Sequence, residues 1–520
     1  MNYFVILFMN SHKGKYIKEY GDFQTPTILA ETIVTKLKSD GISPSTIIEP
    51  TCGTGSFVLA ATRKFPDTKI YGFDLNDEYL RQLNQEIGKL KKEKVVFLEH
   101  TNFFNKNWHE FISKLTAPIL ILGNLPWVTS SEQGLLKGKN LPRKSNIHKF
   151  TGLDSITGKS NFDISEWMIL KLLEAMSDSS GILAILCKVS VARKIFKYVN
   201  TNRLSVSTIT INRIDATTNF NASVDACLLT CSIKPGRTAN VCPVFSSLTS
   251  TNPSSTLGII DKLLVNDMSS FQEMNFLHGK FSIPWRSGIK HDAAKIMILK
   301  NEENSYVNGL NEKVNLEDTY LYPLLKSTDL AHNEVKFTHR WLIVPQKFVG
   351  EDTSKIKGLA PKTWTYLNRN KPLLEKRGSS IYKGKPAFSV FGVGPYTFTH
   401  WKIGVSGLHK QLHFRLIGPI QNKPVVLDDT SYFLPTSSKE EAFLFYALLQ
   451  HPIVLKFLNT FVYWKAKRPI SQKILQQMNL SNIIHKADLN YIYEVMEELS
   501  MNLDTKRLEK LYVQYQTTEN

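Results

Sequence analysis

Short apolar runs alternate with amphipathic segments through the first half of the chain. The apolar runs, which we predict to be β-strands, lie at residues 45–50, 69–75, 94–100, 118–124, 181–187, 206–214 and 225–233. Segments with the apolar spacing of helices lie between them at 56–65, 76–93 and 162–176. Strands separated by helices of this length predict right-handed βαβ units and a mainly parallel sheet. We therefore expect an α/β domain that binds ligands at the carboxyl ends of its strands.

This alternation fades in the second half of the chain. A Ser/Thr/Pro-rich segment, Ser246–Gly258, precedes the change, so we predict one domain over residues 1–245 and another over 246–520. The second segment mixes Lys and Arg with Trp, Tyr, Phe and Gly turns, which favours a mixed α+β domain. A chain of 520 residues is also too long for one simple core.

Charge and cysteine content narrow the class of protein. The formal net charge is +18, which favours an acidic partner, nucleic acid above all; a merely basic surface is the alternative. Cys227 and Cys231 lie in an apolar run without a matching Cys or His pair, so we predict core cysteines, no metal site and a reducing compartment. The apolar start, 1–10, is too short to span a bilayer and lacks signal-peptide features, so no membrane association is expected.

Residues with chemical potential follow the predicted strands. Gly53 and Gly55 come after the first strand, where they allow a ligand to approach the backbone closely, although neither a Walker nor a dinucleotide motif is present. Asp74 ends the second strand, where an acid can bind two ribose hydroxyls or merely cap a helix. After the third strand, Asn102 can read an adenine edge and Phe103 can stack on it. Together these residues predict a nucleoside site.

The fourth strand ends abruptly in Gly123-Asn-Leu-Pro-Trp127. Taken alone, this stretch is equally well explained as an ordinary turn followed by a core tryptophan. Glu49–Phe57 (EPTCGTGSF) followed by Asn124–Trp127 (NLPW) resembles the cofactor and catalytic motifs of the amino-group DNA methyltransferases, which use S-adenosylmethionine. The cofactor motif comes first and no recognition domain fits before Asn124, an order typical of the gamma class, the type II restriction–modification adenine methyltransferases. Asp22–Val34 is similar to that class's N-terminal cofactor segment.

The resemblance implies a Rossmann-like S-adenosylmethionine-dependent methyltransferase domain followed by a DNA-recognition domain. Its implied cofactor-binding residues are Thr25, Pro26, Glu49, Thr51, Gly53, Gly55, Asp74, Leu75, Asn102 and Phe103. Two positions depart from the family pattern. Leu125 replaces a proline whose backbone carbonyl is the functional group, and Asn102 replaces a frequent aspartate, which weakens but does not remove its hydrogen bond to adenine.

The implied catalytic residues are Asn124, Leu125, Pro126 and Trp127. The Asn124 side chain and the Leu125 carbonyl would accept the two N–H groups of adenine N6 and stabilise its developing positive charge. Pro126 would fix the turn, and Trp127 would offer a flat face to the flipped base. Phe220 resembles the aromatic residue that covers the other face of that base, with a core phenylalanine as the alternative. Phe162 and Asp163 match the segment behind the pocket.

We predict that the second domain recognises the DNA target. Basic residues beside aromatic ones suit a groove-reading surface, with solvated basic residues as the alternative. The predicted DNA contacts are Lys144, Arg286, Lys290, Lys385, Lys467 and Arg468.

The expected function is site-specific methylation of N6 of an adenine flipped out of duplex DNA, by the modification enzyme of a restriction–modification system. We also expect a separately encoded endonuclease as partner and a monomeric state. The expected location is the prokaryotic cytoplasm, in association with the nucleoid. Two alternatives remain open. The same motif occurs in RNA-base and protein-glutamine methyltransferases, and Asp329 with Glu334-Val-Lys336 gives a faint nuclease pattern of a fused restriction enzyme.

Overall fold

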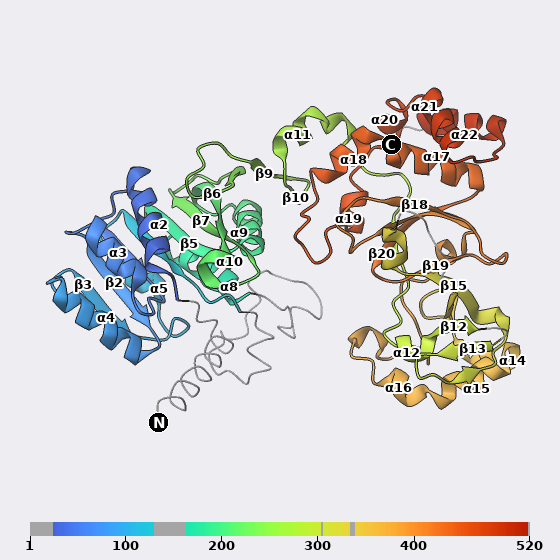
Figure 1. The fold of residues 1–520 in the computed structure, drawn as a ribbon, viewed down its shortest axis with the longest axis horizontal. Coiled ribbons are helices and arrows are strands. Elements are labelled where there is room, and N and C mark those ends of the chain that lie inside the picture. The colour runs from blue at the N-terminus through green and yellow to red at the C-terminus, as the bar shows by residue number, and fades with distance from the viewer. Residues whose placement is uncertain (1–23, 129–162, 303–304, 333–338, 518–520) are drawn as a thin grey trace. The chain divides into compact units, whose positions relative to one another are not determined.

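The computed structural model describes residues 24–128, 163–302, 305–332 and 339–517. The chain divides into two compact units, Met1–Ser269 and Ser270–Asn520 (Figure 1). The large buried cluster around Phe57, Leu83 and Leu120 belongs to the first unit, and a separate cluster around Trp341 and Leu367 belongs to the second. Each unit therefore has its own hydrophobic core.

The first unit is built on a sheet that has ten strands in the described part of the chain, in the order β10-β9-β8-β6-β7-β5-β4-β1-β2-β3. Its strands are β1 (Thr46–Glu49), β2 (Lys69–Asp74), β3 (Val96–His100), β4 (Ile119–Asn124), β5 (Gly181–Lys188), β6 (Val206–Asp215), β7 (Asp225–Ile233), β8 (Val241–Phe245), β9 (Ser255–Ile260) and β10 (Leu263–Val265). Strands β1 to β5 pair in parallel. The seven predicted strands are all present, and the α/β architecture is confirmed.

The sheet is mixed rather than mainly parallel. Strand β7 runs antiparallel to both β5 and β6, and β9 runs antiparallel to β8 and β10. The reason for the first reversal is the connection between β6 and β7, which contains only the short helix α10 (Ala216–Phe220). A parallel crossover needs a dozen or more residues, so the chain turns back beside the strand that it has just left.

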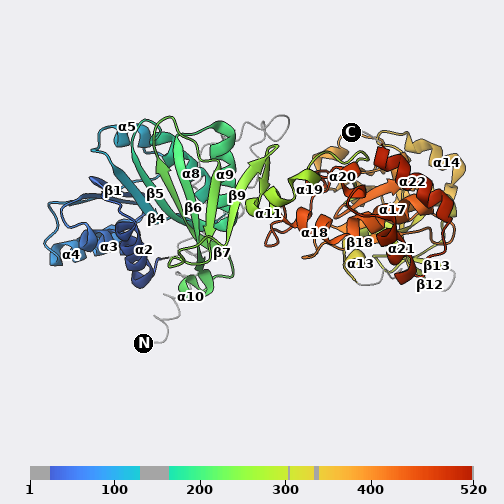
Figure 2. The same ribbon diagram turned by 90° about the horizontal axis from the view of Figure 1, so that it is seen from above.

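Helices cover both faces of this sheet (Figure 2). On one face lie α2 (Thr27–Ser39), α3 (Ser56–Lys64) and α4 (Asp77–Lys89), and on the other α5 (Trp108–Ser113), α8 (Ile164–Ala175) and α9 (Val189–Asn202). Helix α4 illustrates how the local sequence determines a helix. Asn76 caps it by accepting the Glu78 and Tyr79 amides, and Leu83 and Ile87 are buried on one side. Cys227 and Cys231 are fully buried in β7, as predicted for core cysteines.

The division between the units lies after the Ser/Thr/Pro-rich segment, not at its start. This segment connects β8 to β9, which extend the first sheet together with β10. Its polar side chains bond to one another, for example Ser246 to Ser250 at 2.7 Å between hydroxyl oxygens. The composition that suggested a linker at residue 246 is therefore that of a polar turn within the first unit, and the predicted 245/246 boundary shifts to 269/270.

The second unit mixes sheets and helices, as predicted. A four-stranded antiparallel sheet has the order β11-β20-β17-β18 and a six-stranded sheet the order β14-β13-β12-β16-β15-β19, counted over the described residues. The strands are β11 (Arg286–Ser287), β12 (Ile298–Glu302), β13 (Ser305–Asn308), β14 (Lys313–Val314), β15 (Leu321–Leu325), β16 (Arg340–Ile343), β17 (Trp401–Ser406), β18 (Phe414–Ile417), β19 (Val426–Leu427) and β20 (Ser431–Thr436).

The helices of this unit lie both between its strands and after the last of them. They are α11 (Met268–Glu273, which spans the division), α12 (Ala294–Met297), α13 (Ser327–Ala331), α14 (Ile356–Leu359), α15 (Pro361–Arg369), α16 (Lys371–Glu375), α17 (Lys439–Gln450), α18 (Pro452–Asn459), α19 (Gln472–Leu475), α20 (Leu480–Ile484), α21 (Leu489–Glu498) and α22 (Thr505–Thr517). Within the described residues, no single helix is long and apolar enough to cross a membrane; α17 and α18 reach that length only together, across a 64° bend.

Candidate cofactor and catalytic site

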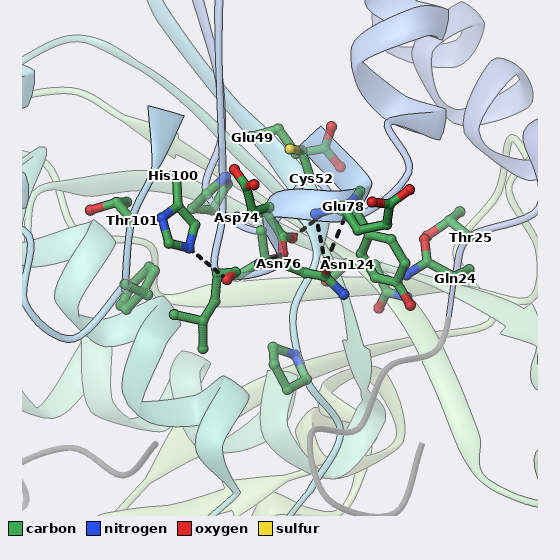
Figure 3. A pocket seen from close by; sticks show the side chains of 18 of the residues that line it. Gln24, Thr25, Glu49, Cys52, Asp74, Asn76, Glu78, His100, Thr101 and Asn124 are labelled. Carbon is green, nitrogen blue, oxygen red and sulfur yellow. Dashed lines mark hydrogen bonds between the residues drawn. The ribbon is translucent and has the colours of Figure 1, made fainter. Parts of the chain in front are cut away.

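A cavity of about 490 Å³ opens where the strand order of the first sheet reverses (Figure 3). Strand β1 has β2 on one side and β4 on the other, and in open α/β sheets ligands bind at this switch point. The volume lies within the ordinary range of small-molecule sites. Of the predicted site residues, those in the lining are Thr25, Glu49, Thr51, Gly53, Asp74, Leu75, Phe103, Asn124 and Pro126.

Asp74 stands at the end of β2 and organises the loop opposite it. One carboxylate oxygen accepts the Gly53 amide at 2.8 Å and the other accepts the Asn76 amide at 2.8 Å. A carboxylate offers about four lone-pair sites, and this one also lines the cavity, which is the position expected of an acid that binds ribose hydroxyls. The acid that the sequence analysis assigned to a ligand thus also fixes the shape of the glycine loop.

The two glycines of this loop have different structural roles. Both have positive φ, 51° at Gly53 and 88° at Gly55, which favours glycine. A Cβ at Gly53 would lie 2.7 Å from the Gln24 side-chain oxygen beside the cavity, whereas one at Gly55 would lie 2.2 Å from Leu83 in the core. Gln24 also accepts the Thr54 amide at 3.2 Å. Gly53 therefore serves the cavity wall, and Gly55 allows α4 to pack closely.

Glu49 places a buried carboxyl group in the cavity wall. It is 3% exposed, and it accepts the Val58 amide at 3.0 Å. Burial raises the pKa of Glu49 well above its usual value, the hydrogen bond from Val58 opposes this, and the nearby Asp74 charge raises the pKa further. Asp77 and Glu78 also line the cavity. Carboxyl groups gathered in this way suit a ligand that carries positive charge, as the sulfonium and amino groups of S-adenosylmethionine do.

Of the two residues predicted to hold the adenine of the cofactor, the structure brings one to the cavity. Phe103 lines it, and Trp108 supports Phe103 from behind, with ring centroids 4.8 Å apart and an indole N–H that donates to the Phe103 carbonyl at 3.0 Å. Asn102 lies outside the lining, and its side-chain oxygen accepts the Phe104 amide at 3.0 Å. The adenine-reading role of Asn102 stays a prediction.

The turn that follows β4 carries the predicted catalytic residues. Asn124 and Pro126 line the cavity, and the Thr51 hydroxyl donates to the Asn124 carbonyl at 3.2 Å. The side chains of Leu125 and Trp127 are 1% and 5% exposed and lie outside the lining. Burial of the Leu125 side chain is compatible with a role carried by its backbone carbonyl.

Trp127 and Phe220 are neighbours, although they are far apart in sequence. Their ring centroids are 5.0 Å apart and the rings meet at 65°. A base stacked between two rings needs two spacings of about 3.5 Å. The rings were expected on opposite faces of one pocket; instead they touch, and Phe220 packs on the core. Pro26, Gly55, Asn102, Leu125 and Trp127 are the predicted cofactor and catalytic residues outside the lining.

The predicted DNA-contacting residues that the structure describes lie in the second unit. The Arg286 guanidinium lies over the Tyr396 ring, 4.4 Å from its centroid. Lys290 pairs with Asp292 at 3.3 Å, and Arg468 pairs with Asp429 at 3.8 Å. Lys385 and Lys467 are exposed. Lys144, like Phe162, lies outside the described residues.

The faint nuclease pattern has a structural explanation at its first residue. Asp329 is 6% exposed, it accepts the Lys326 amide at the start of α13, and both of its oxygens accept Arg340 at 2.5 Å. Glu334 and Lys336 lie outside the described residues. In the part of the chain that the structure describes, no group of three or more His, Cys, Asp or Glu residues is arranged to hold a metal ion.

Several residues of the lining were not predicted from the sequence. Gln24, Asn76, Tyr79 and His100 belong to it, and the His100 ring nitrogen lies 2.8 Å from the Leu75 carbonyl oxygen. A signal was available for two of them, because His100 ends β3 and Asn76 follows β2 by two residues, close to the strand ends where Asp74 lies. Gln24 directly precedes the Thr25-Pro26 pair that was already singled out.

Comparisons with known proteins show the family of this chain. The family model described as N-6 DNA Methylase matches residues 3–194. The type II methyltransferase M.NspV of Nostoc sp. is 44% identical over 464 residues, which cover 89% of this chain and 96% of that protein. The type II methyltransferase M.VspI of Vibrio sp. is 25% identical over 182 residues, 35% of this chain and 40% of that protein.

A solved structure extends the likeness over the second unit. It is that of the type IIL restriction–modification enzyme MmeI in complex with DNA, which covers 99% of this chain and 74% of its own, with a TM-score of 0.50 and 12% sequence identity. At that identity, the likeness concerns the fold: an α/β sheet domain followed by a mixed α+β region.

Proposed function

The chain belongs to the N-6 adenine DNA methylase family of type II methyltransferases, and we propose that it methylates one adenine flipped out of a specific site in duplex DNA. S-adenosylmethionine is the cofactor of this family, and the product is N6-methyladenine. The observation that carries the proposal for this chain's residues is that Asn124 lines the same cavity as the Asp74 and Glu49 carboxyl groups.

Different residues of the cavity bind different parts of the cofactor. Asp74 binds the ribose hydroxyls from its place in the cavity lining at the end of β2, and Phe103 stacks on the adenine face. Glu49 stabilises the positive end of the cofactor, because an ionised carboxylate in a buried site attracts a cation strongly. S-adenosylmethionine supplies an electrophilic methyl group on its sulfonium when bound.

Asn124 and Leu125 prepare the adenine for transfer. The lone pair of N6 is delocalised into the ring, so the amino group is a poor nucleophile. The Asn124 side-chain oxygen and the Leu125 carbonyl accept its two N–H groups and stabilise the positive charge that develops on nitrogen. Pro126 restricts the backbone of the turn, and alignment of N6 with the methyl group supplies much of the remaining rate.

The second unit reads the target, and Arg286 is the residue that we assign to a base edge. Seven arginines lie in residues 270–520, and six of them bond to protein groups: Arg340, Arg369, Arg377, Arg415, Arg468 and Arg507. Among the described residues, the buried Nε of Arg286 has no acceptor, while its guanidinium lies on Tyr396. A guanidinium held flat on a ring with unused donors suits the O6 and N7 acceptors of guanine.

The proposal extends to the biological setting. A separately encoded restriction endonuclease of the same specificity is the partner, because methylation of a site protects only against a nuclease that cuts there. The place of action is then the nucleoid in the cytoplasm. One chain supplies both the cavity and the reading surface, so we propose that the monomer is active.

Long-read sequencing of DNA from cells that express the chain tests this function. We expect N6-methyladenine at one position of one short motif, and we expect Asn124→Ala to abolish it while calorimetry shows unchanged S-adenosylmethionine affinity. N4-methylcytosine as the product, or methylation without a sequence motif, would contradict the proposal.

A pair of arginine variants tests the assignment of Arg286. Arg369 is the matched control, since it also lies on an aromatic ring, Tyr366, but is paired with Glu312. We expect Arg286→Ala to relax selection at one G·C pair, and 7-deazaguanine at that pair to weaken the wild type but not the variant. Arg369→Ala should leave selection unchanged. A motif without any G·C pair would refute the assignment.

A further inference from the structure

Lys188 links the catalytic turn to two other elements of the first unit. It is the last residue of β5, and its ammonium group donates to the Trp127 carbonyl at 2.9 Å. The same group forms an ion pair with Asp163, the N-cap of α8, at 2.7 Å. The Lys188 and Asp163 side chains are 21% and 8% exposed, so the contact is largely shielded from water.

Further hydrogen bonds hold the same end of the turn. The Trp127 indole donates to the Leu186 carbonyl at 3.4 Å, and the Ile164 amide donates to the Val128 carbonyl at 2.9 Å. The other end of the turn is held by the pairing of Asn124 with Leu186 between β4 and β5. Asn124–Trp127 is therefore fixed at both ends, and Lys188 makes a charged contact at its carboxyl end.

We propose that Lys188 is a positioning residue for methyl transfer: it fixes the Trp127 peptide and thereby the Leu125 carbonyl two residues earlier. The inference rests on the proposed roles of Asn124 and Leu125. Lysine suits this position because a carbonyl and a carboxylate are both acceptors, and an ammonium group has three donors to bridge them. Bonds with a charged donor are shorter and stronger than neutral ones, and Asp163 balances the shielded charge.

The expected consequence is a loss in turnover. A misplacement of 1 Å at a reacting group can reduce a rate by about 100-fold. We expect Lys188→Met to lower kcat by about ten- to 100-fold, because the Trp127 peptide loses its charged anchor. The affinity for S-adenosylmethionine should change by no more than about twofold, which corresponds to about 0.4 kcal/mol. The reason is that Lys188 and Asp163 lie outside the cavity lining.

The chain offers a close control in Lys194. This residue of α9 pairs with Glu166 of α8 at 2.7 Å, and the Glu166 side chain is 3% exposed. The two ion pairs thus have the same length, and both carboxylates are largely buried at the start of the same helix, with Asp163 8% and Glu166 3% exposed. In the described part of the chain, the hydrogen bond recorded for the Lys194 ammonium goes to Glu166 alone. Lys194→Met should therefore cost the ion pair without moving the catalytic turn.

The test compares the two variants in steady-state methylation, calorimetry with S-adenosylmethionine and thermal melting. The expected result is a kcat loss confined to Lys188→Met and substantial recovery in Lys188→Arg, which restores a charged donor. Equal kcat losses in Lys188→Met and Lys194→Met, or a change in DNA KM alone, would overturn the inference. If Lys188→Met does not fold, Asp163→Asn replaces it in the test. We expect this variant to lose less kcat than Lys188→Met, and an unchanged kcat would contradict the proposal. Methylation by the wild type tests the proposed function separately.

Discussion

The Trp127 and Phe220 rings touch edge to face, with centroids 5.0 Å apart. Phe220 is the last residue of α10, and Asn221 after it has a positive φ of 49°. This contact leaves no space for a base between the two rings. Stacking of a flipped base on Phe220, as the family resemblance implies, would therefore require the Phe220 ring to turn away from Trp127.

This contact predicts a target-dependent effect of Phe220→Ala. Extrusion of an adenine costs a few kcal/mol, and stacking on a ring returns about 1–3 kcal/mol. We expect the variant to methylate a paired target more slowly, with a smaller deficit on a mispaired target that is easier to extrude. Brightening of 2-aminopurine at the target position should fall in parallel. Equal deficits on both targets would assign Phe220 to the core instead.

The two loop glycines should fail in different ways when they are replaced. Gly55→Ala forces a methyl group against Leu83 at a positive φ, and overpacking of this kind costs about 1–3 kcal/mol of unfolding free energy. Gly53→Ala meets only the flexible Gln24 side chain, so it should weaken cofactor binding more than stability. Denaturant unfolding and calorimetry separate the two effects, and the destabilisations of Gly55→Ala and Leu83→Ala should be less than additive in the double variant, because the shortened side chain makes room for the added methyl group. Identical profiles for Gly53→Ala and Gly55→Ala would refute this division.

The sequence was most informative where one local rule decides a position. Parallel strands put their carboxyl ends at one edge, and this rule alone predicts that Asp74, Gly53 and Asn124 lie at one cavity, as they do. The rule says nothing about side chains behind that edge. The contact of Trp127 with Phe220 depends on packing between elements far apart in the chain, and so it was not predicted in its observed form.

Two other features could not be read locally. Lys188 acts through partners 25 and 61 residues away, and no spacing in the sequence connects them. Strand β7 runs antiparallel to its neighbours because the connection before it contains only a short helix. The alternation of apolar and polar residues along a strand does not indicate whether the strand pairs in parallel or antiparallel. The contacts of Lys188 and the direction of β7 therefore depend on pairing between distant elements rather than on the local sequence pattern.

Glu49 predicts opposite changes in stability and cofactor affinity. Its pKa is raised in the folded protein, chiefly by burial, so the folded state holds a proton that the unfolded state has already released. Stability then falls as the pH rises from the ordinary glutamate pKa towards the raised one. Glu49→Gln removes this penalty, and we expect a higher melting temperature for the cofactor-free variant at neutral pH, with the difference vanishing in acid.

Cofactor affinity should move the other way in the same variant. Hydrogen bonds to charged groups contribute about 1.5–3 kcal/mol, so Glu49→Gln should bind S-adenosylmethionine at least about tenfold more weakly. Wild-type affinity should rise with pH as Glu49 ionises, with proton release on binding. Glu86→Gln, on the exposed side of α4, is the control and should change neither quantity. Unaltered affinity in Glu49→Gln would remove Glu49 from the cofactor site.

A buried lysine in the second unit predicts a stability that rises in alkali. Lys402 is 1% exposed, and its ammonium group donates to the Thr397 and Val425 carbonyls at 2.8 and 2.7 Å. Burial lowers the pKa of Lys402 to about 7, whereas an unfolded lysine titrates near a pKa of about 10.4. Between these values the unfolded state binds more protons, so the free energy of unfolding should increase with pH, by at most about 1.4 kcal/mol per unit.

Lys402→Met should flatten that dependence, because the group that titrates differently in the two states is gone. Below neutral pH the variant avoids a buried charge but leaves two buried carbonyls without their donor, and these effects oppose each other, so the slope rather than the absolute stability is diagnostic. Denaturant unfolding of the full chain at several pH values from about 6 to about 10, which covers most of the window between the two pKa values, measures it. Lys300→Met, at an exposed position of β12, should keep the wild-type slope. A slope that survives Lys402→Met would show that other groups produce it.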